Sequence, residues 1–77
     1  MISSAQNPID LHIGQRTQLA RALAGLKLEE LADALQITPQ QMKGYEAGER
    51  IGAADLFTIA KILNQSISYF YEGLPSD

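Results

Sequence analysis

The chain has 77 residues, enough for one domain with one small core, and 45% of them are hydrophobic, which favours a folded chain over a disordered one. It contains no cysteine, which excludes disulfides and thiolate metal sites, and its single histidine, His12, cannot hold a metal ion alone. No segment approaches the roughly 18 apolar residues needed to cross a membrane, and the N-terminal MISSAQNPID lacks the basic start and apolar run of a signal peptide, so we expect a cytoplasmic protein without metal or cofactor.

The charge balance is acidic, with a formal net charge of −3 and an isoelectric point near 4.9. Domains that bind nucleic acid are usually basic, because neutralising phosphates and releasing counterions supplies much of their affinity. The overall balance therefore argues against a nucleic-acid partner. Whether the chain can bind nucleic acid depends on how its charges are distributed along the sequence.

The sequence pattern divides the chain into a flexible N-terminal arm over residues 1–9, a single domain over 10–74 and a C-terminal tail over 75–77. No strand pattern occurs, and five helical segments predict an all-α protein. The first segment covers about 10–24, and Gly25 fits the left-handed position that ends a helix.

A second helix is expected over 28–35, where apolar residues recur at helical spacing: Leu28, Leu31, Ala32 and Leu35. Glu29 and Glu30 in its first turn suit the positive end of the helix dipole. The position before the helix holds Lys27, which is not a capping residue.

The third helix has the clearest start in the sequence. Thr38 is a good N-cap, Pro39 suits the first helical position, and Gln41 completes a Thr-x-x-Gln capping box. Gly48 then ends the helix.

A fourth helix is expected over 53–63, with Gly52 as a weak cap and Asn64 as its left-handed end. Its buried stripe is Leu56, Ile59, Ala60 and Leu63. Ser66 is expected to cap a short fifth helix that reaches about residue 72.

The second and third helices are joined by only a few residues, so they must cross at a steep angle. Ala32 is small enough to permit their close approach, while Ile37, Met42 and Tyr45 fill the angle. The third helix would then stand away from the body, in a position that fits the major groove of B-DNA.

Here the sequence resembles a known family. Residues 13–74, about four fifths of the chain, resemble the Cro and phage-repressor type of helix-turn-helix domain, the XRE family. The resemblance rests on IGQR, on AGL before LEELADAL, on ITPQQMKGYEAGER and on DLFTIAKILNQSISYFYEGL. It implies a compact five-helix, lambda-repressor-like domain, often dimeric, that binds operator DNA through its third helix.

The resemblance also implies roles for single residues. Arg21 and Glu46 occupy positions at which the family often forms a structural ion pair. The candidate DNA contacts lie in and around the helix pair: Lys27, Thr38, Gln40, Gln41, Lys43 and Arg50. Glutamine can pair with adenine and lysine with guanine, and Gln40 and Lys43 are the better candidates because the capping box can occupy Gln41.

The sequence departs from the family around the turn. Lys27 and Leu28 replace the usual hydroxyl cap and the glutamine that touches the DNA backbone, although Lys27 can still supply charge to a phosphate. Gln36 replaces a turn glycine, which requires a non-glycine residue at positive φ.

Further departures lie on and after the third helix. Pro39 and Gly44 offer no side-chain hydrogen bonds at positions that commonly carry base contacts. A glycine in mid-helix indicates either close approach of another backbone or relaxed constraint. Glu49 adds negative charge, as does Asp55, which is expected to be a solvated carboxylate at the start of its helix.

The segment ISYFYEGL contains three consecutive aromatic residues, which cannot all enter one core because successive helical residues point about 100° apart. Ile67, Phe70, Tyr71 and Leu74 follow helical spacing and are expected to face inward. Tyr69 is then left facing outward or sideways, either as a homodimer contact or as an ordinary partly exposed tyrosine.

The leading hypothesis is a sequence-specific DNA-binding transcriptional regulator, a homodimer that inserts residues 39–47 into the major groove of a symmetric operator. The alternative is a degenerate helix-turn-helix module for protein interaction, such as an antirepressor, a partner subunit or an antitoxin, with weak or no DNA binding. An enzyme is disfavoured, because the sequence has no catalytic grouping, phosphate loop or metal cluster.

Overall fold

A computed structural model describes residues 7–74 of the chain. Its helices are α1 (Pro8–Leu23), α2 (Leu28–Leu35), α3 (Pro39–Ala47) and α4 (Ala53–Leu63), followed by the short helix η1 (Ile67–Tyr71). No strand occurs within this described range, which confirms the all-α prediction. The fifth helical segment is present, but it is a 3₁₀ helix and not an α-helix.

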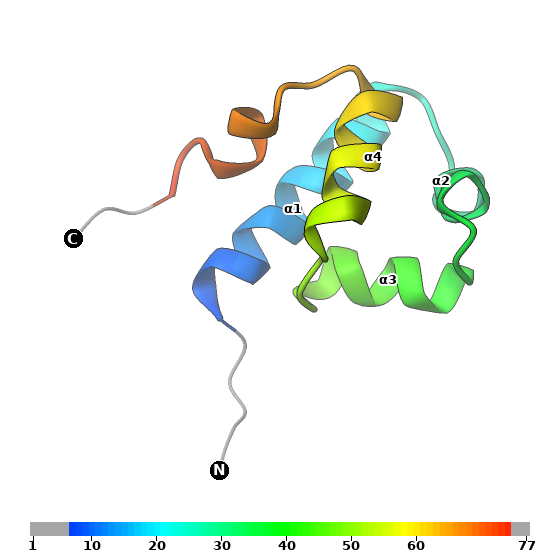
Figure 1. Ribbon diagram of the computed structural model, residues 1–77, viewed down its shortest axis with the longest axis horizontal. Coiled ribbons are helices and arrows are strands. Elements are labelled where there is room, and N and C mark those ends of the chain that lie inside the picture. The colour runs from blue at the N-terminus through cyan, green and yellow to red at the C-terminus, as the bar shows by residue number, and fades with distance from the viewer. Residues whose placement is uncertain (1–6, 75–77) are drawn as a thin grey trace, which may run out of the picture.

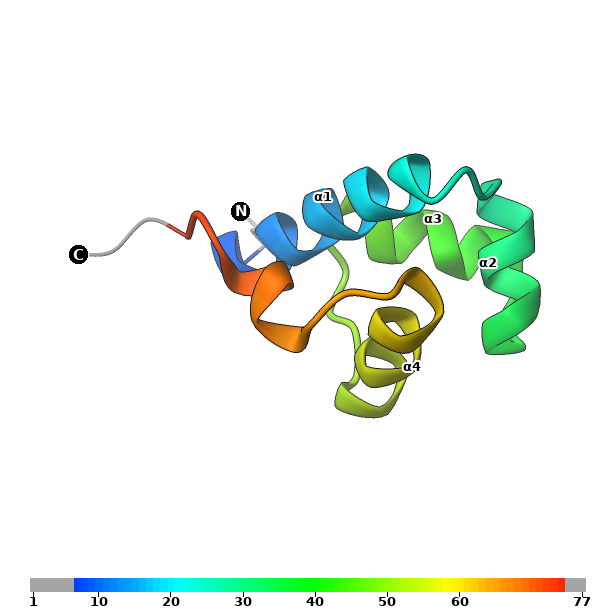
Figure 2. The ribbon, with the colours of Figure 1, turned by 90° about the horizontal axis from the view of Figure 1, so that it is seen from above.

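Figure 1 shows α1 running behind α4, with α3 lying across the base of the molecule and α2 seen nearly end-on beside it. The axes of α2 and α3 therefore cross steeply, as the short connection between them requires. In Figure 2, η1 lies beside α1 at the end of the molecule away from α2.

α1 begins at Pro8, earlier than expected, because Asn7 caps it. The side-chain oxygen of Asn7 accepts a hydrogen bond from the Ile9 amide at 2.7 Å, and Pro8 takes the first helical position, where a missing N–H costs nothing. The helix thus takes in Pro8 and Ile9, which the sequence pattern places in the N-terminal arm. Residues 1–6 of that arm and the tail, residues 75–77, lie outside the described residues.

The turn between α2 and α3 has the geometry predicted for it. Gln36 takes the left-handed conformation, with φ of 59° and ψ of 42°, although it is not glycine. The Ile37 amide donates to the Ala32 carbonyl oxygen at 3.0 Å, which closes the end of α2. The Thr38 hydroxyl then accepts from the Gln41 amide at 3.0 Å, and the Gln41 side-chain oxygen accepts from the Thr38 amide at 2.9 Å. The predicted capping box is confirmed.

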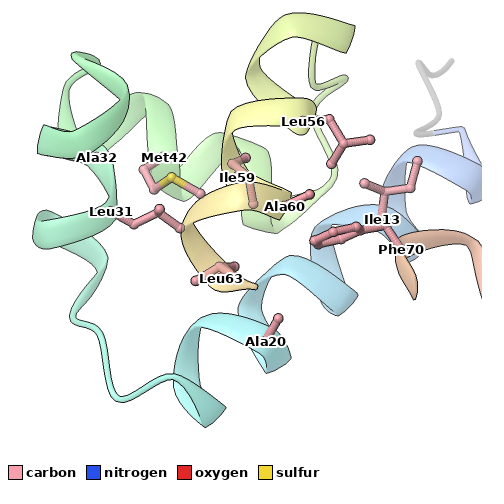
Figure 3. Packing of buried hydrophobic residues seen from close by; sticks show 10 residues of the cluster. All are labelled: Ile13, Ala20, Leu31, Ala32, Met42, Leu56, Ile59, Ala60, Leu63 and Phe70. Carbon is pink, nitrogen blue, oxygen red and sulfur yellow. The ribbon is translucent and has the colours of Figure 1, made fainter. Parts of the chain in front are cut away.

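The core draws buried apolar side chains from all five segments: Ile13, Ala20, Leu31, Ala32, Met42, Leu56, Ile59, Ala60, Leu63 and Phe70 (Figure 3). Leu31 and Met42, from the helix pair, point toward α4. Leu28 and Leu35 pack against the edge of this core, so the predicted stripe of α2 faces inward. Burial of the stripes on α2 and α4 fixes where α3 can lie.

α1 and α3 cross at Gly14, a contact that the sequence pattern does not reveal. Gly14 is buried, and a Cβ atom there would lie 2.5 Å from the Tyr45 carbonyl oxygen and 3.0 Å from that of Glu46. Both oxygens belong to the backbone of α3, which cannot move without the helix. The missing side chain therefore sets how deeply α3 sits on α1.

The inward orientation predicted for Tyr71 is wrong, because η1 has the tighter 3₁₀ winding. With three residues per turn, Ile67 and Phe70 share the inward side, and Tyr71 turns outward with 43% of its surface exposed. Tyr69 is half-buried, which agrees with the sideways orientation expected for a partly exposed tyrosine. Its ring meets Phe70 edge-on at 5.2 Å between centroids, and the guanidinium carbon of Arg16 lies 4.0 Å from the Tyr69 ring centroid.

Polar contacts hold η1 against α1. Arg16 Nε donates to the Tyr69 carbonyl oxygen at 3.1 Å, and Arg16 Nη2 lies 3.3 Å from the Glu72 carboxylate. His12 Nε2 lies 2.6 Å from the Glu72 carbonyl oxygen, so the single histidine helps to hold the segment after η1 against α1. Ser66 precedes η1 as expected, but its hydroxyl makes no capping bond.

We predict that Gly14→Ala lowers the free energy of unfolding by about 1–3 kcal/mol, because a methyl group at the crossing is forced against backbone that cannot yield. Urea denaturation followed by circular dichroism measures the change.

Gly44→Ala, the same substitution on α3, is the matched control. The nearest atoms to a Cβ at that position belong to the flexible end of the Glu49 side chain, so the gain in helix propensity should raise stability by up to about 1 kcal/mol. Equal responses of the two variants would contradict a close crossing at Gly14.

Candidate nucleic-acid interface

α3 turns one side to the core and the other to solvent. Met42 and Glu46, one turn apart, are buried. Because successive residues lie about 100° apart, the opposite side carries Gln40, Gly44 and Ala47, with Lys43 on one flank. We define Gln40, Gly44 and Ala47 as the outer side of α3.

Two candidate DNA contacts on α3 are exposed and unengaged. Within the described range 7–74, the side chains of Gln40 and Lys43 make no hydrogen bond or ion pair. Gln41 and Thr38 are exposed too, but each already uses a side-chain oxygen in the capping box. The preference for Gln40 and Lys43 over Gln41 therefore agrees with the geometry.

Lys27 occupies the N-cap position before α2, but its side chain makes no capping hydrogen bond. Its backbone amide donates to the Glu30 carboxylate at 2.7 Å, which supplies the acidic half of a capping box. The other half of a capping box needs a side-chain oxygen that accepts from the Glu30 amide, and the Lys27 ammonium can only donate hydrogen bonds. Lys27 is exposed.

An open hollow of about 320 Å³ lies between α1, the start of α2 and α3. It is lined by Gln18, Arg21, Leu28, Lys43, Glu46 and Ala47. Lys27 immediately precedes Leu28, which lines the hollow together with Lys43, so the backbone of Lys27 borders the hollow on this flank of α3. We call this flank, with its two lysines, the positive flank.

Arg50 reaches in another direction from the two lysines. It follows α3, and its Nε atom lies 3.3 Å from the Asp10 carboxylate in the first turn of α1. The Arg50 side chain is 74% exposed, whereas the Asp10 side chain is only 16% exposed, so solvent reaches this pair mainly from the arginine side. The exposed guanidinium can turn from Asp10 to another anion, and the Asp10 carboxylate then keeps the favourable interaction with the N-terminal end of α1.

The predicted ion pair between Arg21 and Glu46 is present. Arg21 Nε donates to one Glu46 carboxylate oxygen at 2.6 Å, Nη2 donates to the other at 3.1 Å, and Nη1 donates to the Leu26 carbonyl oxygen at 2.9 Å. The two side chains are only 15% and 6% exposed. Hydrogen bonding of its guanidinium to the Glu46 carboxylate is the main cause that raises the pKa of Arg21 above its ordinary value. Arg21 thus belongs to the scaffold and is not available to a phosphate.

Asp55 is not the solvated carboxylate expected from the sequence. The Tyr45 hydroxyl donates to the half-buried Asp55 carboxylate at 2.5 Å, which ties the start of α4 to α3. This hydrogen bond is the main cause that raises the pKa of Tyr45 to about 12, so the phenol keeps its proton at neutral pH. Tyr45 lies about 200° around the helix from Lys43, and Asp55 therefore adds negative charge on the flank away from the lysines.

Glu49 adds a second carboxylate near α3: its charge contributes to the raised pKa of Tyr45, and its side chain reaches Gly44 on the outer side. Its side chain, and not another backbone, covers Gly44. We call Glu49 and Asp55 the acidic flank of α3. A glutamate five residues after a mid-helix glycine is the signal that could have pointed to this contact. The pairing of Tyr45 with Asp55 has no comparable local signal, because it joins two helices.

Two further classes of site are absent from residues 7–74. They contain no group of three or more His, Cys, Asp or Glu side chains that could hold a metal ion. None of the helices there is both long and apolar enough to cross a membrane.

A family model described as Helix-turn-helix matches residues 18–70, more than half of the chain. The chain belongs to the helix-turn-helix family. The matched residues include the whole helix pair and the ion pair that positions α3. This family comprises transcriptional regulators and is not a class of enzymes.

The curated relatives are helix-turn-helix proteins of greater length. An uncharacterized HTH-type transcriptional regulator from Sinorhizobium medicae is 46% identical over 72 residues, which are 92% of this chain and 52% of the relative. An uncharacterized transcriptional regulator in the ATPase CF(0) region of Rhodospirillum rubrum is 40% identical over 67 residues, 86% of this chain and 62% of the relative. The helix-turn-helix chain thus spans about half the length of the first of these relatives.

Solved structures share the fold at lower identity. The clp gene regulator ClgR from Corynebacterium glutamicum superposes with a TM-score of 0.79 at 22% identity, over 87% of this chain and 72% of that chain. The restriction-modification controller protein C.AhdI from Aeromonas hydrophila gives a TM-score of 0.71 at 23% identity, over 78% of this chain and 92% of that chain.

We predict that Glu46→Gln lowers the free energy of unfolding of this helix-turn-helix domain by about 2 kcal/mol. Removing one partner of a fully buried pair costs about 3–5 kcal/mol, and the loss is smaller here because Arg21 keeps some solvent contact and an amide oxygen still accepts. Chemical denaturation measures it.

Glu72→Gln, at the pair with Arg16, is the control. The Glu72 side chain is 64% exposed, so its loss should change stability by less than about 1 kcal/mol. If Glu46→Gln proved as mild as Glu72→Gln, the buried ion pair would not be what holds α3 on α1.

Proposed function

We propose that this chain is the DNA-binding part of a transcriptional regulator and that α3, residues 39–47, enters the major groove of a duplex operator. Its relatives carry the names of HTH-type transcriptional regulators. The observation that carries the proposal is the unengaged state of Gln40 and Lys43, which are exposed on a helix held out by the core. Their amide and ammonium groups match the hydrogen-bonding edges of adenine and guanine.

The number of positively charged side chains near α3 determines the expected affinity for DNA. Lys27 and Lys43 share the positive flank, and Arg50 can leave Asp10 to reach a phosphate. A specific binder commonly neutralises more phosphates than three side chains can, so one subunit alone binds weakly. Two subunits acting on one symmetric site would raise the affinity by making the second contact intramolecular.

We predict that the protein binds duplex DNA in a salt-dependent way and that Lys43→Ala and Arg50→Ala both weaken the binding. Lys43→Ala should cost about 1–3 kcal/mol and alter sequence preference, because a base contact is lost. Arg50→Ala should weaken binding evenly across sequences and reduce the salt slope by up to about 1, because only a phosphate contact is lost. Fluorescence anisotropy on random duplexes and on duplexes selected from a library, at low and moderate salt, measures both.

Lys61→Ala is the control for charge, since Lys61 is exposed in the last turn of α4, at the far end of that helix from α3. It should leave base preference unchanged. Absence of duplex binding at low salt, or indifference to the Lys43 and Arg50 substitutions, would instead favour a protein-interaction module. The acidic flank of α3 is the observation that supports this second candidate.

We further propose that the regulator is a homodimer and that the surface around η1 is where two copies meet. Tyr71 is the exposed aromatic residue of that surface, and Tyr69 lies half-buried beside it. Tyr69 remains a candidate contact through its exposed part, but its ring also packs on Phe70 and Arg16. Tyr71 therefore gives the cleaner test.

We predict that Tyr71→Ala raises the dimer dissociation constant about tenfold, as loss of a buried aromatic contact of about 1–2 kcal/mol would do. Sedimentation velocity over a concentration series measures it. Phe57→Ala, on α4 and 63% exposed, is the matched comparison and should leave the constant unchanged. If Phe57→Ala raised the dissociation constant and Tyr71→Ala did not, the dimer interface would lie on α4. A monomer at every concentration would refute the homodimer.

A further inference from the structure

Gly44 leaves a gap at the centre of the outer side of α3. It stands one turn after Gln40, and both lie opposite the buried Met42. Were α3 to enter a groove, the side chain at position 44 would be among those nearest the bases. Glycine offers nothing there, so another group must occupy the space or it stays open to water.

The Glu49 side chain occupies that gap. Gly48 ends α3 at φ of 116°, and the Glu49 amide donates to the Gly44 carbonyl oxygen at 2.9 Å. This reversal returns the chain alongside the helix, and the Glu49 carboxyl carbon lies 2.6 Å from where a Cβ of residue 44 would be. The carboxylate can lie there only because residue 44 has no side chain.

The chemistry of a carboxylate restricts what it can contact in a major groove. An ionised carboxylate only accepts hydrogen bonds. Guanine presents two acceptors and thymine one, which repel it, while adenine places an acceptor beside its donor. Cytosine presents the N4 amino group, and Glu or Asp accepting from that group is an established form of base contact. A cytosine therefore suits the space in front of Glu49 best.

We propose that Glu49 is a specificity-determining residue that selects one cytosine per half-site through its N4 amino group, in place of the side chain that residue 44 lacks. This inference rests on the proposed DNA-binding function. In this arrangement Gln40 and Glu49 read neighbouring bases from the outer side of α3, and Lys43 acts from the positive flank. A negative charge at the helix centre then gives selectivity at some expense of overall affinity, because it also repels phosphates.

The test compares base preference, and not affinity alone, across five proteins. Selection from a randomised duplex library followed by sequencing gives the preference of the parent, Glu49→Gln, Gly44→Ala and the double variant. Asp33→Asn is the control for charge: Asp33 is exposed on α2, so this substitution removes one negative charge that does not belong to α3 or to its C-terminal turn.

The expected result is loss of about tenfold discrimination for cytosine at one position per half-site in Glu49→Gln, the size typical of a direct base contact. Gly44→Ala should lose the same preference while keeping its charge, because the new methyl group displaces the carboxylate. The double variant should lose no more than either single variant, since both changes break one contact. Asp33→Asn should keep the parental preference.

Two outcomes would overturn the inference, and they are distinguishable. If the parent selects a sequence and both Glu49→Gln and Gly44→Ala keep its full preference, Glu49 only repels phosphates and the proposed function survives. If the parent binds no duplex at low salt, the proposed function fails and this inference fails with it. Thermal melts check that the variants remain folded, and Gly44→Ala should melt above the parent.

Discussion

The crossing of α1 over α3 is the constraint on which the rest of the molecule depends. Gly14 lets the two backbones meet, and the bidentate pair between Arg21 and Glu46 fixes the rotation of α3 about its own axis. Once Glu46 and Met42 face inward, Gln40 and Gly44 must face solvent. The residues offered to a partner are therefore selected by two contacts on the opposite side of the same helix. A chain with the same outer residues but a different crossing would present another set.

Local signals were enough to predict most of the backbone. The capping box at Thr38 and Gln41 fixed the start of α3, and the periodic apolar residues fixed the bounds of α2 and α4. These features involve residues only a few positions apart, so they can be recognised in a single sequence. The start of α1 was missed because Asn7 and Pro8 read equally well as the end of an arm. The winding of η1 was missed because a short segment of five residues does not distinguish period three from period 3.6.

The candidate site was harder to predict, because its decisive contacts join distant positions. The Arg21–Glu46 pair could be named only from a family resemblance. No pattern indicated that Tyr45 holds Asp55 or that Arg50 turns to Asp10. Each of these contacts changes how much charge reaches a partner: one fixes a carboxylate beside α3, and the other withdraws a guanidinium. The sequence shows which charged side chains are present. Which of them form ion pairs or hydrogen bonds within the protein, and which remain available to a partner, is determined by the tertiary fold.

The Arg50–Asp10 pair supplies the chain with an internal counterion. An incoming anion that recruits Arg50 must displace Asp10, whose carboxylate then remains stabilised by the positive end of α1, in whose first turn it lies. Added electrolyte weakens the old and the new contact of Arg50 alike, because the guanidinium is exposed to solvent in both. The two effects partly cancel, so the ionic-strength response of anion binding through Arg50 is flatter than a fully hydrated arginine would give.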